Sequence, residues 1–442
     1  SHSSYTTGSG MINDGIITAD AGTTATTSQG TSYTGLNPYQ RIIFTTIDAD
    51  SGSISRYNRY FYFTNNGTIT LNGTSDVLAN FATPGSSTGG TRFTNNSIVH
   101  LNGQSSVGIM LNSGVSNFGN SQILLNSPIE ISGDKSVGVQ LTNSNFNLGN
   151  SKINLNLGTT GNVANSTGNI TGNNASLVEG AVGVLVSSAG SAFTLKDYKI
   201  NIGDHSLSNA GVRVATGNIT LDTNGVNSSI DFSANSSQNA GVSITGATSS
   251  ATTAGITINL DGTSNVGAQV ENSGTFNHTK GTINISGQGN SGITTLSSAT
   301  TNMNNALAII NVGAKGTGAY NASVFNLTAG TISATGDSAV AVYGAAGNTT
   351  TNINGGKIEV GSGGIALFSG NLSKININSA ADIKANAGGL LFYNHDGGMF
   401  TGKYVLDGVV SPRVEAGGMV FYYKGGSLSI SDLAGIPNIL NS

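Results

Sequence analysis

The sequence predicts an all-β protein folded as a right-handed parallel β-helix, with three short strands in each rung of about 25 residues. Three observations lead to this fold. A motif such as "SVGV" or "NAGV" recurs along the chain, apolar and polar residues alternate around its glycine, and Gly, Ser, Thr and Asn separate the apolar runs.

The composition indicates a folded chain with an unusual surface. Charged residues are 9% of the 442 residues, against about 25% in typical globular proteins. The chain also has 64 glycines. Disordered chains are poor in apolar residues and carry a high net charge, whereas this chain is 37% apolar with a net charge of −4. We therefore expect a folded and extended protein.

The same composition excludes several kinds of site. The chain has no cysteine, so it forms neither a disulfide framework nor a thiolate metal site. With a pI near 5.7 and no basic cluster, it offers no electrostatic footprint for nucleic acid. No run approaches the roughly 18 apolar residues of a membrane-spanning helix. Residues 1–30 do not resemble a signal peptide, so we expect that any such signal has been removed.

The recurring motif gives the first two interior columns. The residues one and three places after its glycine are mostly apolar and the residue between them is polar, as with Val139, Gln140 and Leu141. This period of two is typical of a strand with one buried face. Aligned on the glycine, successive rungs place at this position Gly108, Gly138, Gly183, Gly211, Gly241, Gly267, Gly292, Gly318, Val340, Gly364, Gly389 and Gly418.

Two further apolar segments follow in each rung and supply its other strands. One is a looser column of Phe118, Phe146, Phe193, Ile219, Phe276, Met303, Phe325, Ile353 and Phe400. The other carries inward pairs such as Ile153 and Leu155, Ile200 and Ile202, and Ile258 and Leu260. Parallel rungs stack equivalent side chains about 4.8 Å apart, which explains why residue types recur.

Glycine and asparagine have expected roles in this stack. The motif glycine indicates a tight corner or a close approach of backbone, where a side chain would not fit. Asparagines in the turns should stack as hydrogen-bonded ladders. The right-handed sense is expected from the bias of parallel crossover connections. An antiparallel sandwich or barrel is the alternative fold, but such folds have no reason to repeat side-chain type at a fixed period.

We expect a single β-helix over residues 1–442. Residues 1–63 should form N-terminal rungs or a cap with an irregular, aromatic-rich excursion. Regular rungs should occupy residues 64–425, with a loop insertion or one irregular rung near residues 156–180. Residues 426–442 should form the C-terminal end, with a continuing segment beyond them.

The N-terminal excursion contains the candidate partner-binding residues. Tyrosine and arginine are enriched at binding hot spots, and aromatic faces also stack on sugars. Bulky residues would equally cover the open edge of a terminal rung, so capping and partner binding both stay open. The candidate contacts are Arg56, Tyr57, Arg59, Tyr60 and Tyr62.

Towards the C-terminus the outward column is expected to become apolar. We assign Val342, Leu391 and Val420 to that outward column. Aromatic residues lie close by in sequence, namely Phe368, Tyr393, Tyr422 and Tyr423. We expect a cap, a following segment or an oligomer partner to pack on this face.

The sequence predicts no catalytic, cofactor or metal site. Enzymes with this fold need clustered carboxylates on one outer face, and the 21 acidic residues do not stack at matching positions. The pairs His395–Asp396 and Asp204–His205 are interpreted as solvated turn residues. The segment "ADSGS" resembles a protease nucleophile segment, but only His2 precedes its Ser51, which leaves no His–Asp–Ser triad.

The repeated units carry a resemblance to a known family. Units such as Ser106 to Ile123 and Ser136 to Ile153 resemble the passenger domains of monomeric autotransporters, which are self-secreted surface proteins of Gram-negative bacteria. The resemblance covers roughly residues 64–430. It implies a right-handed β-helix exported through a C-terminal outer-membrane β-barrel of the same polypeptide. Many members of this family adhere to host cells or other bacteria.

We therefore expect a non-catalytic, monomeric segment of a surface adhesin and virulence factor. Its partner would be a protein or glycan on a host cell or another bacterium. A carbohydrate-active β-helix enzyme, such as a polysaccharide lyase or hydrolase, is one alternative, and a groove gathering three or more carboxylates would favour it. A phage tailspike-like trimer is the other, favoured only by a trimer in solution.

Overall fold

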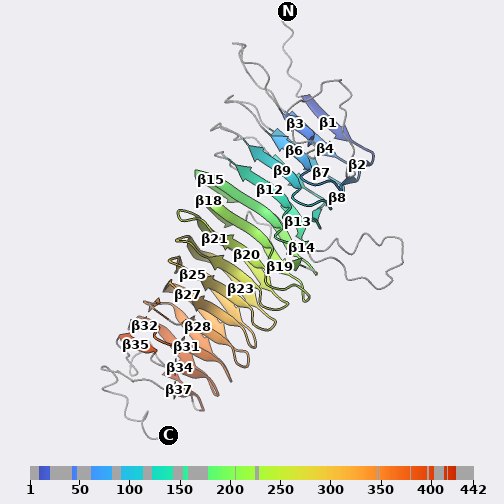
Figure 1. Ribbon diagram of the computed structural model, residues 1–442. Coiled ribbons are helices and arrows are strands. Elements are labelled where there is room, and N and C mark those ends of the chain that lie inside the picture. Colours follow the sequence, from blue (N-terminus) through green and yellow to red (C-terminus); the bar gives the residue numbers. More distant parts are fainter. Residues whose placement is uncertain are drawn as a thin grey trace, which may run out of the picture. The chain divides into compact units, whose positions relative to one another are not determined.

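The computed structural model contains β-strands and no helix among the residues that it describes. These are residues 9–19, 42–46, 61–81, 91–112, 122–142, 153–157, 178–204, 206–223, 228–345, 347, 349–378, 380–395, 398–402, 413–415 and 417–424. The chain forms two compact units, Ser1–Ser228 (unit 1) and Ser229–Ser442 (unit 2). Within each unit the strands stack as a parallel β-solenoid (Figure 1).

Each rung contains three strands, which we number as its first, second and third face. In unit 1 the first face contains β1 (Ser9–Asn13), β4 (Phe61–Asn65), β7 (Thr91–Asn95) and β10 (Gln122–Leu125). The second contains β2 (Ile17–Ala19), β5 (Ile69–Leu71), β8 (Val99–Leu101), β11 (Ile129–Ile131), β13 (Ile153–Leu157) and β16 (Tyr198–Ile202). The third contains β3 (Ile42–Thr46), β6 (Val77–Phe81), β9 (Val107–Asn112), β12 (Val137–Thr142), β15 (Val182–Leu195) and β18 (Ala210–Asp222). The short strands β14 (Val178–Glu179) and β17 (Ser206–Leu207) pair separately.

Unit 2 has the same three faces, but several strands run across the corner between the first and second. These long strands are β21 (Ser250–Leu260), β23 (Thr275–Ile285), β25 (Thr300–Val312) and β27 (Val324–Ala334). The first face continues in β29 (Thr350–Ile353), β32 (Lys374–Ile377) and β35 (Met399–Gly402), and the second in β19 (Ser229–Phe232), β30 (Lys357–Val360), β33 (Asp382–Ala385) and β36 (Arg413–Val414). The third contains β20 (Ala240–Ile244), β22 (Val266–Val270), β24 (Ser291–Thr295), β26 (Thr317–Asn321), β28 (Val340–Gly344), β31 (Ile365–Ser369), β34 (Leu390–His395) and β37 (Met419–Lys424).

The predicted fold class is confirmed, because like side chains lie over like inside each unit. Val139 pairs in parallel with Val184, and both are fully buried. The same interior column contains Ile109 and Val212 in unit 1. The corresponding column of unit 2 contains Val242, Ala268, Ile293, Ala319, Val342, Leu367 and Phe392. The right-handed sense stays a prediction from connection chirality.

The motif glycine marks a close approach of backbone, as predicted. A Cβ added to Gly138 would lie 2.7 Å from the carbonyl oxygen of Gly183 in the next rung. At Gly267 the corresponding distance to the Gly292 oxygen is 2.4 Å. Both distances are shorter than van der Waals contact, so a larger residue there requires the backbone to shift.

A second recurring geometry lies at the corner just before the third-face strands from β6 onward. The corner residue has a left-handed backbone, with φ between 55° and 84°. In unit 1 these residues are Ser75, Ser105, Lys135, Gly180 and Ser208. In unit 2 they are Gln238, Ser264, Gly289, Lys315, Ser338, Gly363, Gly388 and Gly417. Only glycine adopts this conformation without a steric cost, which explains the glycines in the last three rungs.

The sequence alignment is wrong in the last four rungs, and the corner glycines explain the error in three of them. The alignment placed Val340, Gly364, Gly389 and Gly418 in the motif-glycine position, but strand register places Ala341, Ala366, Leu391 and Val420 there. At Gly364, Gly389 and Gly418 the alignment follows the corner glycine pairs instead. As a result Val342 and Leu391, predicted to face outward, are fully buried in the interior, and Val420 is half-buried.

The looser column was also two columns merged into one. Phe193 does pair with Ile219, as predicted. In unit 2, however, Phe325 pairs with Thr301 and Thr351, whereas Met303 and Ile353 belong to the adjacent inward column two residues further along the strand. Both columns are buried, so alternation of apolar residues did not separate them. Similarly, Ile153 pairs with Tyr198 rather than with Ile200.

Unit 1 has one asparagine ladder in its interior and another on its surface. In the interior, Asn13 Nδ2 donates to Asn65 Oδ1 at 2.8 Å, and Asn65 Nδ2 donates to Asn95 Oδ1 at 2.7 Å. One residue further along the chain an exposed ladder runs in parallel, with Asn96 donating to Asn66 at 2.9 Å and accepting from Asn126 at 2.8 Å. The two ladders have the same chemistry and differ in burial.

The buried and the exposed ladder together allow a matched test of how much a buried ladder adds to the free energy of unfolding. Asn65→Ala leaves a buried acceptor on Asn95 and a buried donor on Asn13 without their partner, which should cost about 2 kcal/mol of unfolding free energy. Asn96→Ala exposes its partners to water and should cost about 0.5 kcal/mol or less. Urea unfolding of the two variants measures both values, and equal losses would contradict the burial argument.

Candidate interaction surface

Most of the predicted partner-binding residues lie outside the described part of the chain. These are Arg56, Tyr57, Arg59 and Tyr60. The backbone of Tyr62 lies in β4, in register with Arg92 of β7. The greater part of the predicted insertion, residues 158–177, and residues 425–442 are also outside the described residues. The candidate surface is therefore built from the outward columns of unit 2, one on each face.

On the first face of unit 2 the outward column is an amide ladder. Each asparagine donates from Nδ2 to the Oδ1 of the previous one, at 2.8 to 3.0 Å. The first asparagine donates to the hydroxyl of Thr252 at 3.5 Å. The ladder consists of Thr252, Asn277, Asn302, Asn326, Asn352 and Asn376. It is neutral, and its groups largely satisfy one another.

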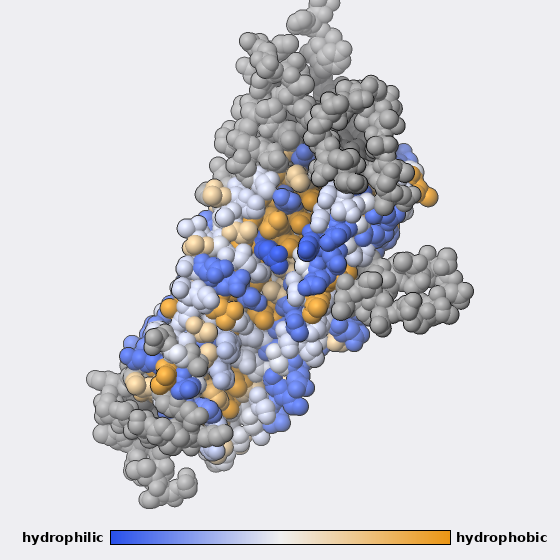
Figure 2. Space-filling view, in the orientation of Figure 1, coloured by the Kyte–Doolittle hydropathy of each residue, from blue (hydrophilic) through white to orange (hydrophobic). Residues whose placement is uncertain are grey.

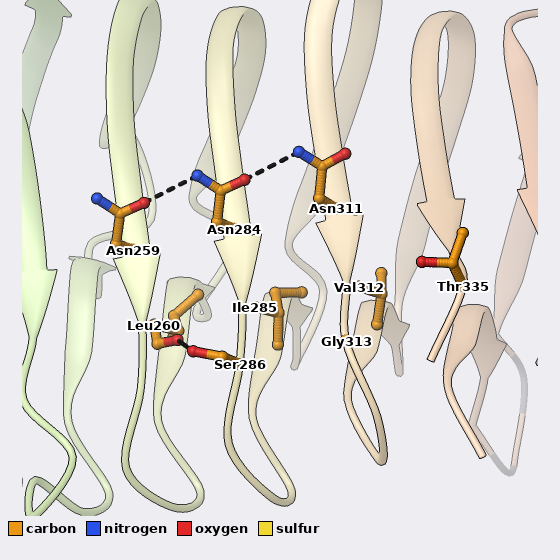
Figure 3. A pocket seen from close by; sticks show the side chains of 9 residues that line it. All are labelled: Asn259, Leu260, Asn284, Ile285, Ser286, Asn311, Val312, Gly313 and Thr335. Carbon is orange, nitrogen blue, oxygen red and sulfur yellow. Dashed lines mark hydrogen bonds between the residues drawn. The ribbon is translucent and has the colours of Figure 1, made fainter. Parts of the chain in front are cut away.

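The second face carries a shorter ladder that forms one wall of a groove. Asn311 donates to Asn284 at 2.9 Å, Asn284 to Asn259 at 2.8 Å, and Asn259 to the carboxylate of Asp231 at 2.6 Å. Figure 3 shows the three amides in a row above the groove. The groove has a volume of about 340 Å³ and is lined by Asn259, Leu260, Asn284, Ile285, Ser286, Asn311, Val312, Gly313 and Thr335. None of these side chains titrates, so the lining supplies no acid, base or carboxylate.

The third face carries a column of stacked aromatic rings, which we call the aromatic strip. Its members are Tyr320, Tyr343, Phe368, Tyr393 and Tyr422. Successive ring centroids are 5.3, 4.4, 4.5 and 4.8 Å apart, and the ring planes differ by 10° to 27°. Parallel register causes this geometry, because it places equivalent side chains directly over one another.

The residues beside the strip are also apolar. Val340 and Ile365 occupy the first position of their strands and are half-buried, while Met419 in the same column is 53% exposed. In unit 1 the equivalent positions pack together, with Met110 and Leu185 lying against a cluster of Val77, Val107, Val137 and Val182. Hydrophobic residues show at the surface over β28 and β31 (Figure 2). Tyr422 ends the described strip with a 47% exposed side chain.

The aromatic strip is uncharged. Burial, followed by the neighbouring phenols of Tyr320 and Tyr393, raises the pKa of Tyr343, so its hydroxyl keeps its proton at neutral pH. The third-face strands from β20 to β34 contain no Asp, Glu, Lys or Arg. His395 follows at the end of β34, with its ring stacked 6.2 Å from Phe368 and 6.5 Å from Tyr393.

The ion pairs found among the described residues lie away from the strip. On the second faces, His100 contacts Glu130 at 3.2 Å, and Lys357 contacts Glu359 at 2.7 Å. The hydrogen bond from Lys357 lowers the pKa of Glu359, with a further contribution from Asn386. Within the described ranges no three His, Asp or Glu side chains lie close enough to hold a metal ion, and no helix is long and apolar enough to cross a membrane.

The comparisons with known proteins give no assignment. No protein-family model, no curated protein sequence and no solved structure matches the chain. The candidate surface is therefore argued from its own geometry and chemistry.

One buried histidine lies in the interior of unit 2. The Nε2 atom of His278 is 3.2 Å from the carbonyl oxygen of Ile309, and its Nδ1 is 2.6 Å from the hydroxyl of Thr253. A carbonyl oxygen only accepts, so Nε2 carries the proton and Nδ1 accepts from Thr253. Burial lowers the pKa of His278 to about 4, although the hydrogen bond to Ile309 opposes this shift.

The lowered pKa predicts a loss of stability in mild acid. In the unfolded chain the imidazole binds a proton below about pH 6.5, whereas the folded state resists protonation until about pH 4. Unfolding free energy should therefore fall between these two values, by about 3 kcal/mol in all. His278→Met, which copies Met303 of the next rung, should remove this part of the decrease. Urea unfolding from pH 7 to 4 tests it, and an unchanged pH profile in the variant would contradict it.

Proposed function

We propose that the chain is a non-catalytic segment of a bacterial surface adhesin, of the kind seen in passengers of monomeric autotransporters. In this proposal it acts in attachment to host cells or other bacteria and so contributes to virulence. It is displayed outside a Gram-negative cell and is tethered through a C-terminal outer-membrane barrel of the same polypeptide. The β-helix supplies a stiff scaffold, and its outer columns supply the contact surface.

One observation carries this proposal, namely the aromatic strip on the third face of unit 2. Four half-buried rings and the exposed Tyr422 in one continuous outward column are costly for a surface that meets only water, and tyrosine is typical of binding hot spots. The groove on the second face supports a binding role over an enzymatic one, because no titratable side chain lines it. The residues Arg56, Tyr57, Arg59, Tyr60 and Tyr62 stay a second proposed contact region.

Cell binding tests the proposal with a matched pair of variants. Labelled full-length chain should bind cultured epithelial cells or a panel of bacteria saturably, and unlabelled chain should compete. Phe368→Thr should weaken this binding about tenfold, because it removes a central ring of the strip while keeping a residue that suits a strand. Gln269→Thr, in the same outward column but outside the strip, should leave binding unchanged.

Other outcomes would replace the proposal. Release of new reducing ends or unsaturated uronates from polysaccharides would favour the enzyme alternative. A trimer in analytical ultracentrifugation would favour a tailspike-like assembly. Equal binding by the two threonine variants, with loss after Arg56→Ser and Arg59→Ser together, would move the contact surface to the N-terminal segment.

A further inference from the structure

The aromatic strip has an unusual property for a recognition surface, since its rings cover one another. The closest pairs, Tyr343–Phe368 and Phe368–Tyr393, stack at 4.4 and 4.5 Å with planes 10° apart. No ligand group enters between rings at these separations. Between its two end rings the strip therefore presents ring edges, tyrosine hydroxyls and the neighbouring aliphatic side chains, but not open ring faces.

This geometry disfavours a glycan as the occupant. Sugars use aromatic residues by lying flat on an exposed ring face, and each inner ring of the strip has both faces covered. Ring edges instead suit the faces of other aromatic groups, in the edge-to-face arrangement, and the packing of aliphatic side chains. Both kinds of group belong to proteins.

The size of the strip limits the partner further. Four rung steps of about 4.8 Å make it about 19 Å long, and the two apolar columns, three residues apart on each strand, make it about 10 Å wide. The resulting footprint of about 200 Å² is a quarter of the roughly 800 Å² that each side of a stable protein interface buries. A second copy of this chain, or a globular partner, would need contacts beyond the strip. A single linear segment would not, since about six extended residues or about 13 helical residues cover the length.

The charge of the surface fixes the chemistry of that segment. The third-face strands β20 to β34, which contain four of the five rings, have no acidic or basic residue besides His395, and the Tyr343 hydroxyl stays neutral. In β37 a basic residue, Lys424, is in register with His395 at the end of the strand. A charged side chain buried on this surface would lose its water without gaining a counter-charge. An uncharged segment with aromatic or aliphatic side chains avoids this cost.

We infer that the aromatic strip binds a short linear segment of a partner protein, apolar and uncharged, that lies along the stacked rings. The inference rests on the proposed adhesive function and names the class of partner at the same surface. The inner rings, Tyr343, Phe368 and Tyr393, form the centre of the contact, and Met419 and Tyr422 extend it. The amide ladder of the first face and the groove of the second take no part.

A displayed library of random linear peptides tests this inference on the full-length chain. Peptides of about 15 residues are long enough for either conformation. Selection should enrich sequences rich in Phe, Trp, Leu and Ile and poor in charge. Tyr393→Lys, which places a charge in the strip, should weaken a selected peptide about tenfold or more. Gln269→Lys, at the equivalent position outside the strip, should change its Kd less than about twofold.

Phe368→Thr gives a second variant, so that one misfolded protein does not decide the result. An array of neutral and acidic glycans is probed in parallel with the parent chain and with Tyr393→Lys, Phe368→Thr and Gln269→Lys. The inference is overturned if selected peptides bind Tyr393→Lys and Phe368→Thr as tightly as the parent, or if a glycan signal is lost in those variants alone. If Tyr393→Lys and Phe368→Thr both bind cells as well as the parent does, the inference about the strip is overturned and the proposed adhesive function is kept. If the strip binds peptides but the chain binds no cells, the proposed adhesive function is overturned and the inference about the strip is kept.

Discussion

Parallel in-register stacking is the constraint on which the rest of this structure depends. Every side chain in a strand lies about 4.8 Å from the equivalent side chains of the neighbouring rungs. A residue type therefore recurs in a column only where it can pack against, or hydrogen-bond to, another residue of the same type. Valine and isoleucine do so by packing, asparagine by donating and accepting at once, and aromatic rings by stacking. Two like charges at that spacing repel by about 1 kcal/mol even in water. The low content of charged residues follows from this repulsion.

Several charged residues on the described strands have a complement in the neighbouring rung. Glu130 is in register with His100 and contacts it, and Asp231 ends the asparagine ladder by accepting from Asn259. The same rule operates in the interior, where His278 lies over Thr253, whose hydroxyl donates to it. In these three columns the residue type changes through a pair of residues that satisfy each other.

In-register stacking explains how much of the fold could be predicted from the sequence. Alternation around the motif glycine predicted the interior column from Ile109 to Ala319, because each of its members is apolar and each glycine permits the same backbone approach. The prediction was wrong from Val340 onward, where Ala341, Ala366, Leu391 and Val420 replace the motif glycine. Corner glycines appear two positions before the last three of these strands. Composition does not separate a glycine needed for close approach from one needed for a left-handed φ.

The aromatic strip was missed for the same reason, although its signal is in the sequence. Once Tyr320, Tyr343 and Phe368 are placed in register with Gln269 and Thr294, they fall in the outward column, not beside it. The earlier rungs of unit 2 place the polar residues Ser243, Gln269 and Thr294 there, so within unit 2 the aromatic residues are confined to the last rungs. Only the register, which depends on backbone pairing, shows that these rings touch.

Stacking also determines what the strip can offer to a partner. A free tyrosine or phenylalanine on a surface loses rotamer freedom when it is bound, at about 0.5–1.5 kcal/mol for each immobilised side chain. Here the rings above and below Phe368 already restrict it, so most of that cost is incurred during folding. Neighbouring rings gain about 0.5–1.5 kcal/mol per pair in return, which helps to hold the last rungs of unit 2 together. The same contacts that make the strip narrow and close its ring faces thus make it rigid, and rigidity allows a small uncharged surface to bind a short segment with useful affinity.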